Sequence, residues 1–97
     1  LEEAKKIFEE KDKLYGSAYK RHGNLMITMF PDGITLNTAE DFEKFYLFTM
    51  IANKMNRYAS HLSMKTDGQD TTKDIGIYSF MLKEIEEEKK DDTTARS

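Results

Sequence analysis

Residues 39–62 lie in the longest stretch of this chain that neither proline nor glycine interrupts. Asn37 and Thr38 just before it are both suitable N-cap residues, and Glu40 and Asp41 each follow one of them by three positions, as in a capping box. The pattern predicts a helix from about residue 39 to about residue 62. A helix of this length spans most of a small domain, so the remaining elements have to pack against it.

Two sides of this predicted helix carry residues suited to packing. One side holds mostly small residues, which let a second helix approach closely: Phe45, Thr49, Ala52, Asn56 and Ala59. The opposite side begins with the larger apolar residues Leu47, Met50 and Ile51. Because both sides are apolar, we expect this helix to lie at the centre of the fold.

A first helix is predicted before it, from about Glu2 to about Arg21, with a bend or an end near Gly16. The tripeptide His22-Gly23-Asn24 has the composition of a helix stop. Residues 25–37 follow and contain Pro31-Asp32-Gly33, a turn sequence. We expect a helical turn or two in this region, and a short β-hairpin is the alternative.

A third helix is predicted to begin with a second capping-box pattern, Thr71 with Asp74, and to run to about Glu88. Its buried positions would be Ile75, Tyr78, Leu82 and Ile85. The charged residues 89–97 are expected to form a flexible tail, so the predicted domain covers residues 1–88. The fold class is therefore all-α, with three to four helices around a long central one.

Composition bounds the size of the core and the classes of function. The chain has 97 residues, of which 38% are hydrophobic and 34% charged. So small a core stabilises a monomer weakly, and we expect a homo-oligomer. The net charge of −3 argues against general DNA or RNA binding, although a few local cations suffice for a phosphorylated ligand.

Several kinds of site are excluded by missing residues or motifs. The chain has no cysteine, which removes disulfides, thiolate metal sites and cysteine nucleophiles. It contains neither a Gly-x-Ser-x-Gly elbow nor a P-loop, so we predict no catalytic residue and no cofactor. No apolar run approaches the roughly 20 residues that cross a bilayer, and no signal-peptide pattern is found. We expect a cytoplasmic protein without a membrane partner.

The strongest candidate site is a stripe on the central helix. Lys54, Arg57, Tyr58 and His61 follow one another at helical spacings that place them on one face. A guanidinium pairs with phosphate in a bidentate manner and lysine supplies a point charge, while tyrosine or histidine can stack on a base. The stripe therefore predicts a site for a phosphorylated, ring-containing ligand.

A second cluster near the end of the first helix has the same mixture of residues: Tyr15, Tyr19, Lys20, Arg21 and His22. If the end of the first helix lies beside the central helix, both clusters line one pocket. The alternative for both is ordinary amphipathic packing, with the tyrosines at the rim of the core and Arg57 paired with Asp74.

Carboxylates offer an enzymatic alternative. Asp70 and Asp74 are four positions apart at the start of the third helix, and Mg²⁺ prefers such oxygen ligands. Glu9 and Asp12 on the first helix have a similar spacing. Magnesium enters only under this alternative, since charge-rich helices produce such pairs freely.

Four segments together resemble a known family: "EEKDKLYGSAYKRHG", "FPDGITLNTAEDF", "FTMIANKMNRYASH" and "DTTKDIGIYSFMLKEI". The family comprises small, largely helical proteins of tailed bacteriophages known as hypothetical or nucleotide-modification-associated proteins. The resemblance spans most of the chain except the tail, and it implies a phage origin, the host bacterial cytoplasm and a link to nucleotides. The last helix is also distantly similar to the all-α nucleotide pyrophosphatases, although their two Glu-x-x-Glu/Asp pairs are not reproduced in order.

These observations lead to three hypotheses. The first is a non-enzymatic homo-oligomer that sequesters a nucleotide, including a cyclic immune signal, by analogy with the small "sponge" proteins of phages. The second is a Mg²⁺-dependent nucleoside triphosphate pyrophosphatase or nucleotide-modification protein. The third is a module that binds a host protein through the small-residue side of the central helix and methionine-rich patches.

Overall fold

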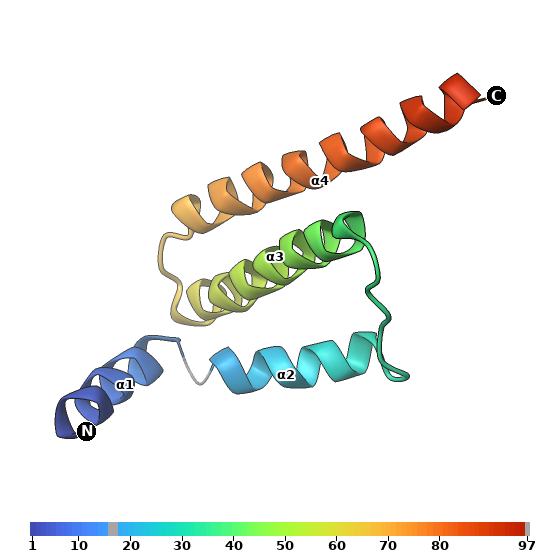
Figure 1. The fold of residues 1–97 in the computed structure, drawn as a ribbon. Helices are drawn as coiled ribbons and strands as arrows, with labels where there is room; N and C mark the ends of the chain where they lie inside the picture. The colour runs from blue at the N-terminus through green and yellow to red at the C-terminus, as the bar shows by residue number, and fades with distance from the viewer. Residues whose placement is uncertain (16–17, 97) are drawn as a thin grey trace.

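The fold is all-α, as predicted, and is seen in a computed structural model that describes residues 1–15 and 18–96, with side chains described for residues 1–10 and 19–88. The described chain forms four helices in the order α1 (Glu2–Tyr15), α2 (Ala18–Met29), α3 (Ala39–Met64) and α4 (Gln69–Arg96) (Figure 1). Residues 25–37 are the end of α2 and a loop, and the described residues contain no strand.

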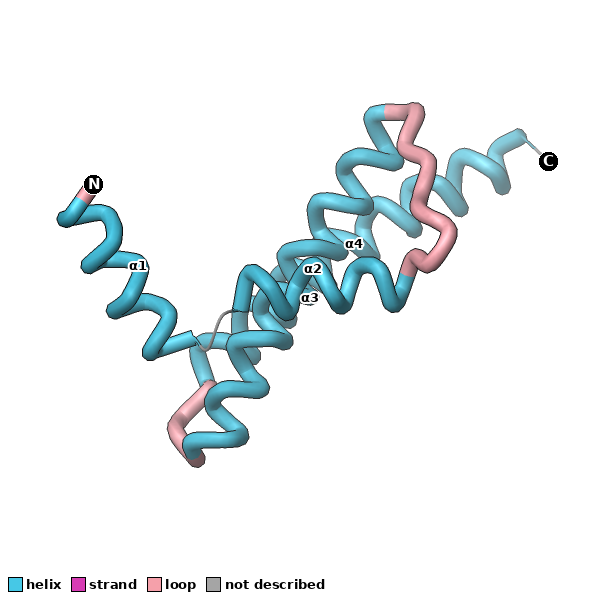
Figure 2. The backbone as a smooth tube through the Cα atoms, turned by 90° about the horizontal axis from the view of Figure 1, so that it is seen from below, coloured by secondary structure: helices cyan, strands magenta, loops and turns pink. Residues whose placement is uncertain are grey.

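The long helix α3 lies at the centre, as its two apolar sides predicted. The helix α4 runs antiparallel to it along one side, and α2 lies along another (Figures 1 and 2). On the small-residue side of α3, Phe45 meets Phe30, which directly follows α2, whereas Ala59 is exposed.

The start of α3 is a complete capping box. The Asp41 backbone N–H donates to Thr38 Oγ1 at 3.0 Å, and the Thr38 backbone N–H donates to Asp41 Oδ2 at 3.3 Å. Thr38 is thus the N-cap, and the Asn37 N–H adds a bond to the same carboxylate at 3.1 Å. The helix ends two residues after the predicted position, where Lys65 adopts the left-handed conformation (φ 55°) and its N–H bonds to the His61 carbonyl.

The contact between α3 and α4 is a seam of residues spaced alternately three and four apart. Such spacing is typical of antiparallel helices that pack side chain into groove. Leu47 of α3 and Thr71 of α4 are its most buried members, at 6% and 5% exposed. The other members are partly buried: Lys44, Ile51, Lys54, Tyr58 and His61 of α3, and Ile75, Tyr78, Leu82 and Ile85 of α4.

Two ion pairs across the seam set its register. Lys44 Nζ lies 2.5 Å from Glu86 Oε1, and Lys54 Nζ lies 3.0 Å from Asp74 Oδ2. The hydrogen bond to Glu86 raises the pKa of Lys44 above its ordinary value, an effect that desolvation opposes and nearby acidic charges support. Because the two pairs lie ten residues apart along α3, sliding one helix by a turn would break both.

The contact between α2 and α3 is aromatic instead. The ring of Phe30, which directly follows α2, lies 5.5 Å from the Phe48 ring in an edge-on arrangement and 6.1 Å from the Phe45 ring. Ala52, one turn further along α3, is 6% exposed. This small residue leaves room for α2, as the pattern predicted.

The first helix ends where a bend or an end was predicted near Gly16, since α1 stops at Tyr15. The extent to Arg21 and the stop at residues 22–24 were wrong, because a separate helix, α2, continues through those residues to Met29. Gly23 lies inside α2 and faces open space, with no atom within 4 Å of the position its Cβ would take, so no close approach requires glycine there. The actual stop is Pro31, which cannot continue a helix.

The predicted start of the last helix was also wrong. Thr71 is 5% exposed and belongs to the seam, so its hydroxyl does not cap the helix. The first turn begins earlier, where Asp67 Oδ1 accepts a bond from the Gln69 N–H at 2.9 Å. The helix then continues to Arg96, through most of the segment 89–97 that we expected as a tail. The flexibility of that segment and the domain boundary before it stay predictions.

Candidate functional site

The predicted stripe on α3 divides between the seam and a cavity beside it. Lys54 belongs to the seam, where its side chain is 13% exposed and paired with Asp74. The packing alternative had paired Asp74 with Arg57, which lies one turn after Lys54 on α3. Lys54 is therefore paired with a carboxylate on the neighbouring helix, and its role as a ligand contact stays a prediction.

Tyr58 supports the loop between α3 and α4. A Cβ atom on Gly68 would lie only 2.8 Å from Cε1 of the Tyr58 ring. The loop can approach the ring this closely only because residue 68 is glycine. Tyr58 therefore has a packing role, which the sequence analysis had given as the alternative.

His61 anchors the same loop from the end of α3. Its Nδ1 lies 2.7 Å from Thr66 Oγ1, and the Thr66 backbone N–H donates to the His61 carbonyl at 3.0 Å. Because Nδ1 is engaged by the loop hydroxyl, the imidazole is held in one orientation.

A cavity of about 410 Å³ lies between the last turns of α3 and the first turn of α4. From α3 it is lined by Arg57, Ser60, His61 and Met64; the opposite wall is formed by Thr66 and Asp67 of the loop and Asp70 and Thr71 of α4. Its volume falls within the range of roughly 300–1,000 Å³ found for small-molecule sites.

The lining of this cavity combines one cation, several hydroxyl groups, two carboxylates and an apolar side chain. Asp67 uses one oxygen to hold the first turn of α4, while Asp70 is exposed at that turn. The positive end of the α4 dipole also lies at this wall. The arrangement can accept an anion beside Arg57 and hydrogen-bond donors beside the carboxylates.

Two lining residues that the sequence analysis missed carried a signal. Ser60 and Met64 follow Arg57 at spacings of three and seven, so they extend a stripe that starts at Arg57 instead of Lys54. Thr66 and Asp67 carried none, because loop residues have no periodicity and reach the cavity only through the fold of the turn.

The second predicted cluster does not join this cavity. Tyr19 is 60% exposed, its ring lies 5.9 Å from that of Phe8 on α1, and Lys20 Nζ lies 5.9 Å from the Tyr19 ring centre. Arg21 is exposed on α2. The side chain of Tyr15 lies outside the described residues.

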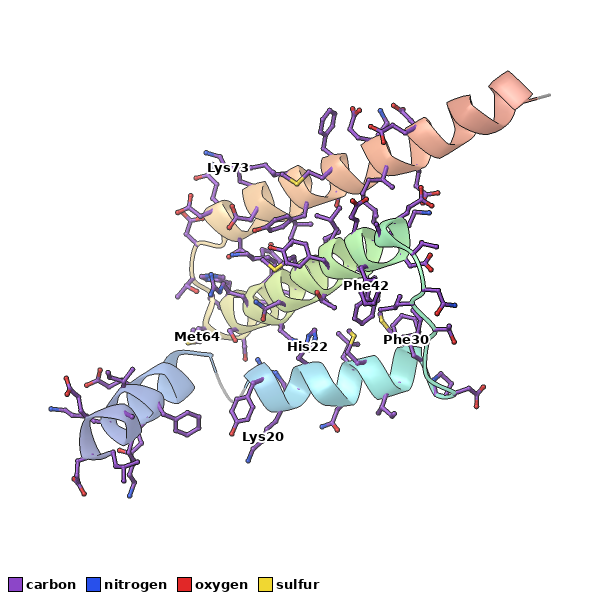
Figure 3. All side chains as sticks on the ribbon, viewed as in Figure 1. Lys20, His22, Phe30, Phe42, Met64 and Lys73 are labelled. Atoms are coloured by element: carbon purple, nitrogen blue, oxygen red, sulfur yellow. The ribbon has the colours of Figure 1, made fainter. Side chains whose placement is uncertain are left out.

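His22 points from α2 toward α3 (Figure 3). Its Nδ1 is buried and has no hydrogen-bond partner among the described residues, and Asn56 Nδ2 of α3 is in the same condition. His22 therefore belongs to the interface between α2 and α3 rather than to the cavity.

The carboxylates of the enzymatic alternative have different surroundings. Asp70 lines the cavity, whereas Asp74 is paired with Lys54. Among the residues with described side chains, no three His, Cys, Asp or Glu residues are grouped as a metal site. Within the same part of the chain, no helix has both the length and the apolar character needed to cross a membrane.

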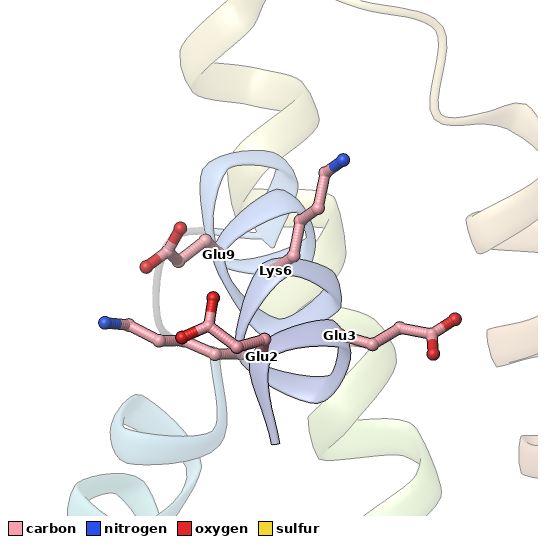
Figure 4. Close-up of a pocket in the computed structure, with 5 residues that line it drawn as sticks. Glu2, Glu3, Lys6 and Glu9 are labelled. Atoms are coloured by element: carbon pink, nitrogen blue, oxygen red, sulfur yellow. The ribbon is translucent and has the colours of Figure 1, made fainter.

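Among the described residues, two further cavities have linings less suited to a ligand. One is formed by the first turns of α1 alone, where Glu2, Glu3, Lys6 and Glu9 point away from a single helix (Figure 4). The other, about 230 Å³, lies under the loop between α2 and α3 and is largely apolar. Neither has walls of mixed charge from two helices, as the α3–α4 cavity does.

No protein-family model, curated protein or solved structure matches this chain. Its function therefore has to be argued from the chemistry of the α3–α4 cavity and from the surfaces around it.

Proposed function

We propose that the protein is a homo-oligomer that binds a phosphorylated nucleotide in the α3–α4 cavity and holds it without cleaving it. The observation that carries this proposal is the cavity of about 410 Å³ in which Arg57 faces the first turn of α4. In a phage-infected cell, such a protein would remove a nucleotide signal, including a cyclic one, from the host.

Arg57 and the helix terminus supply the anion-binding part of the site. A guanidinium donates two parallel hydrogen bonds to a phosphate, and the N-terminus of a helix favours negative charge. The hydroxyl groups of Ser60 and Thr66 add donors for further phosphate or sugar oxygens. In this proposal Lys54 does not contact the ligand, because Asp74 already neutralises it.

The carboxylates favour a nucleotide over inorganic phosphate. Asp70 beside the cavity repels a bare anion, but its oxygens accept hydrogen bonds from the amino or ring N–H groups of a base. Met64 offers an apolar, polarizable surface for the ring. A ligand that is anionic at one end and a hydrogen-bond donor at the other satisfies both walls.

The first test is a thermal-shift screen with linear and cyclic nucleotides, using inorganic phosphate as the control ligand. A ligand present at 100 times its Kd stabilises the folded state by about 2.7 kcal/mol, which is readily detected. The recovered ligand is then analysed by chromatography after incubation with Mg²⁺. A binder returns it intact, whereas conversion to products would support the pyrophosphatase alternative on Asp70 and Asp74.

Calorimetry on the Arg57→Ala variant tests the residue itself. We expect a loss of about 2–5 kcal/mol of binding free energy, because a buried charge contact to the phosphate disappears. Lys73→Ala removes a matched cation on the exposed part of α4 and should leave the affinity unchanged. Equal binding by wild type and Arg57→Ala would remove Arg57 from the site, and a screen without any nucleotide hit would overturn the proposed function.

A further inference from the structure

The chain exposes far more surface than a folded monomer of its mass. Its accessible surface is 7774 Å², whereas a monomer of 11.3 kDa exposes about 5,700 Å². The radius of gyration is 17.0 Å, against about 12.5 Å for a compact chain of this length. The excess of about 2,000 Å² per chain is within the range that one partner buries in an obligate dimer.

The apolar side chains also indicate that one chain buries too little surface. Among the residues with described side chains, Leu47 and Ala52 are the buried hydrophobic ones. Large apolar groups on α3 and α4 are about half exposed instead, including Tyr46 at 59%, Ile77 at 48% and Met81 at 45%. An exposed apolar area of this extent is typical of an interaction surface.

Part of this exposed apolar area, together with the partly buried Met50, lies along one flank that leads away from the cavity. Arg57 and Asp70 both line the cavity, so they lie on the same flank of the α3–α4 seam. Met50 precedes Arg57 by seven residues and Ile77 follows Asp70 by seven, so two helical turns bring each of them to that same flank. The ion pairs Lys44–Glu86 and Lys54–Asp74 set residues 46–52 level with residues 77–83. Tyr46 and Met81 continue along the same flank, and we name this set the apolar flank: Tyr46, Met50, Ile77 and Met81.

We infer that the apolar flank docks the apolar flank of a second copy of this chain, forming a two-fold symmetric dimer. A two-fold interface joins a surface to itself, so the surface must carry no excess of one charge. All four residues of the flank are uncharged. The Asp74 carboxylate, three positions before Ile77, is paired with Lys54, so it adds no net charge where the flank meets itself. The pairing of two hairpins gives a four-helix core of α3 and α4, which supplies the burial that one chain lacks.

This inference does not rest on the proposed nucleotide binding, although it places the partner next to the cavity. The flank begins two turns from Arg57 and Asp70, so the partner covers the hairpin beside the cavity opening. The occupant proposed here is a second copy of the chain. The experiment below distinguishes it from a different protein that binds the same flank.

Sedimentation equilibrium tests the dimer. We expect wild type at twice the monomer mass of 11.3 kDa, and a shift to the monomer for the double variant Ile77→Glu/Met81→Glu. The matched control is Ile27→Glu, since Ile27 lies on α2 and is 63% exposed but outside the flank; it should remain dimeric. A monomeric wild type would overturn the inference and leave the flank to another protein, as would a control that dissociates equally.

Cross-linking keeps the test decisive if the charged variant fails to fold. The chain has no cysteine, so Ile77→Cys and Ile27→Cys each carry a single thiol in an otherwise unchanged protein. A short bis-maleimide reagent should link Ile77→Cys into covalent dimers and leave Ile27→Cys monomeric. Equal yields from the two positions would contradict the proposed interface. Nucleotide binding by a monomeric but folded variant would show that the dimer and the ligand site are independent.

Discussion

The central helix α3 meets its two neighbours through different chemistry. Toward α4 it presents a regular seam that includes the buried Leu47 and two ion pairs. Toward α2 it presents the rings of Phe45 and Phe48, which surround Phe30. Ion pairs demand one register, whereas aromatic rings tolerate several mutual angles. The α3–α4 hairpin is therefore the frame that defines the cavity, and α2 covers the opposite side.

The largest expected effect falls on the seam. Leu47→Ala should lower the free energy of unfolding by about 3 kcal/mol, because it leaves a cavity at the buried apolar position of the α3–α4 contact. Chemical denaturation followed by circular dichroism measures this. Leu62→Ala is the control, since Leu62 is 66% exposed, and should cost less than about 0.5 kcal/mol. Similar losses at both positions would mean that the seam is not the main contact of the fold.

A smaller loss of stability, confined mainly to α2, is expected from a change in the contact between α2 and α3. Phe48→Ala should cost about 2 kcal/mol and remove hydrogen-exchange protection mainly from α2, because it breaks the ring cluster with Phe30. Phe48→Leu retains apolar bulk without the ring and should lose less. If α4 lost protection together with α2, the two sides of α3 would form one cooperative unit and the comparison would fail.

The smallest expected free-energy change is the coupling within the Lys54–Asp74 ion pair near the cavity. A double-mutant cycle with Lys54→Met and Asp74→Asn should give a coupling free energy of about 0.5–1 kcal/mol, because Lys54 is mostly buried although Asp74 is 42% exposed. The exposed pair Lys83–Glu87 within α4 serves as the reference, with about 0.3 kcal/mol expected. Equal coupling in the two pairs would show that the seam pair contributes no more than a surface pair.

The site could be anticipated only in part. Helical spacing predicted one stripe of Lys54, Arg57, Tyr58 and His61, but the same spacing also describes a packing seam, and the structure divides the stripe between the seam and the cavity. Their separate roles depend on which face of α3 packs against α4, and the sequence of α3 alone does not determine that face. Arg57 lies one residue away from the seam positions, and that offset of about 100° around the helix is what places it in the cavity wall.

The boundaries of α1 and α2 were missed for a related reason. Gly23 is a helix breaker by propensity, yet its cost of about 1 kcal/mol is offset when the helix packs through neighbouring residues such as His22. Thr71 likewise has a good capping residue type but is buried at the seam. In both cases a long-range contact outweighs a local preference of similar size.

The chain by itself determined the all-α class, the extent of α3 and the presence of two packed sides on it. These follow from the capping residues at Thr38 and Asp41 and from apolar periodicity, which are properties of neighbouring residues. Only the tertiary structure decided that Lys54 pairs with Asp74 and that Arg57 lines a cavity. The loop at Gly68 turns α4 back along α3, and contacts between residues far apart in sequence depend on that turn, which no local pattern encodes.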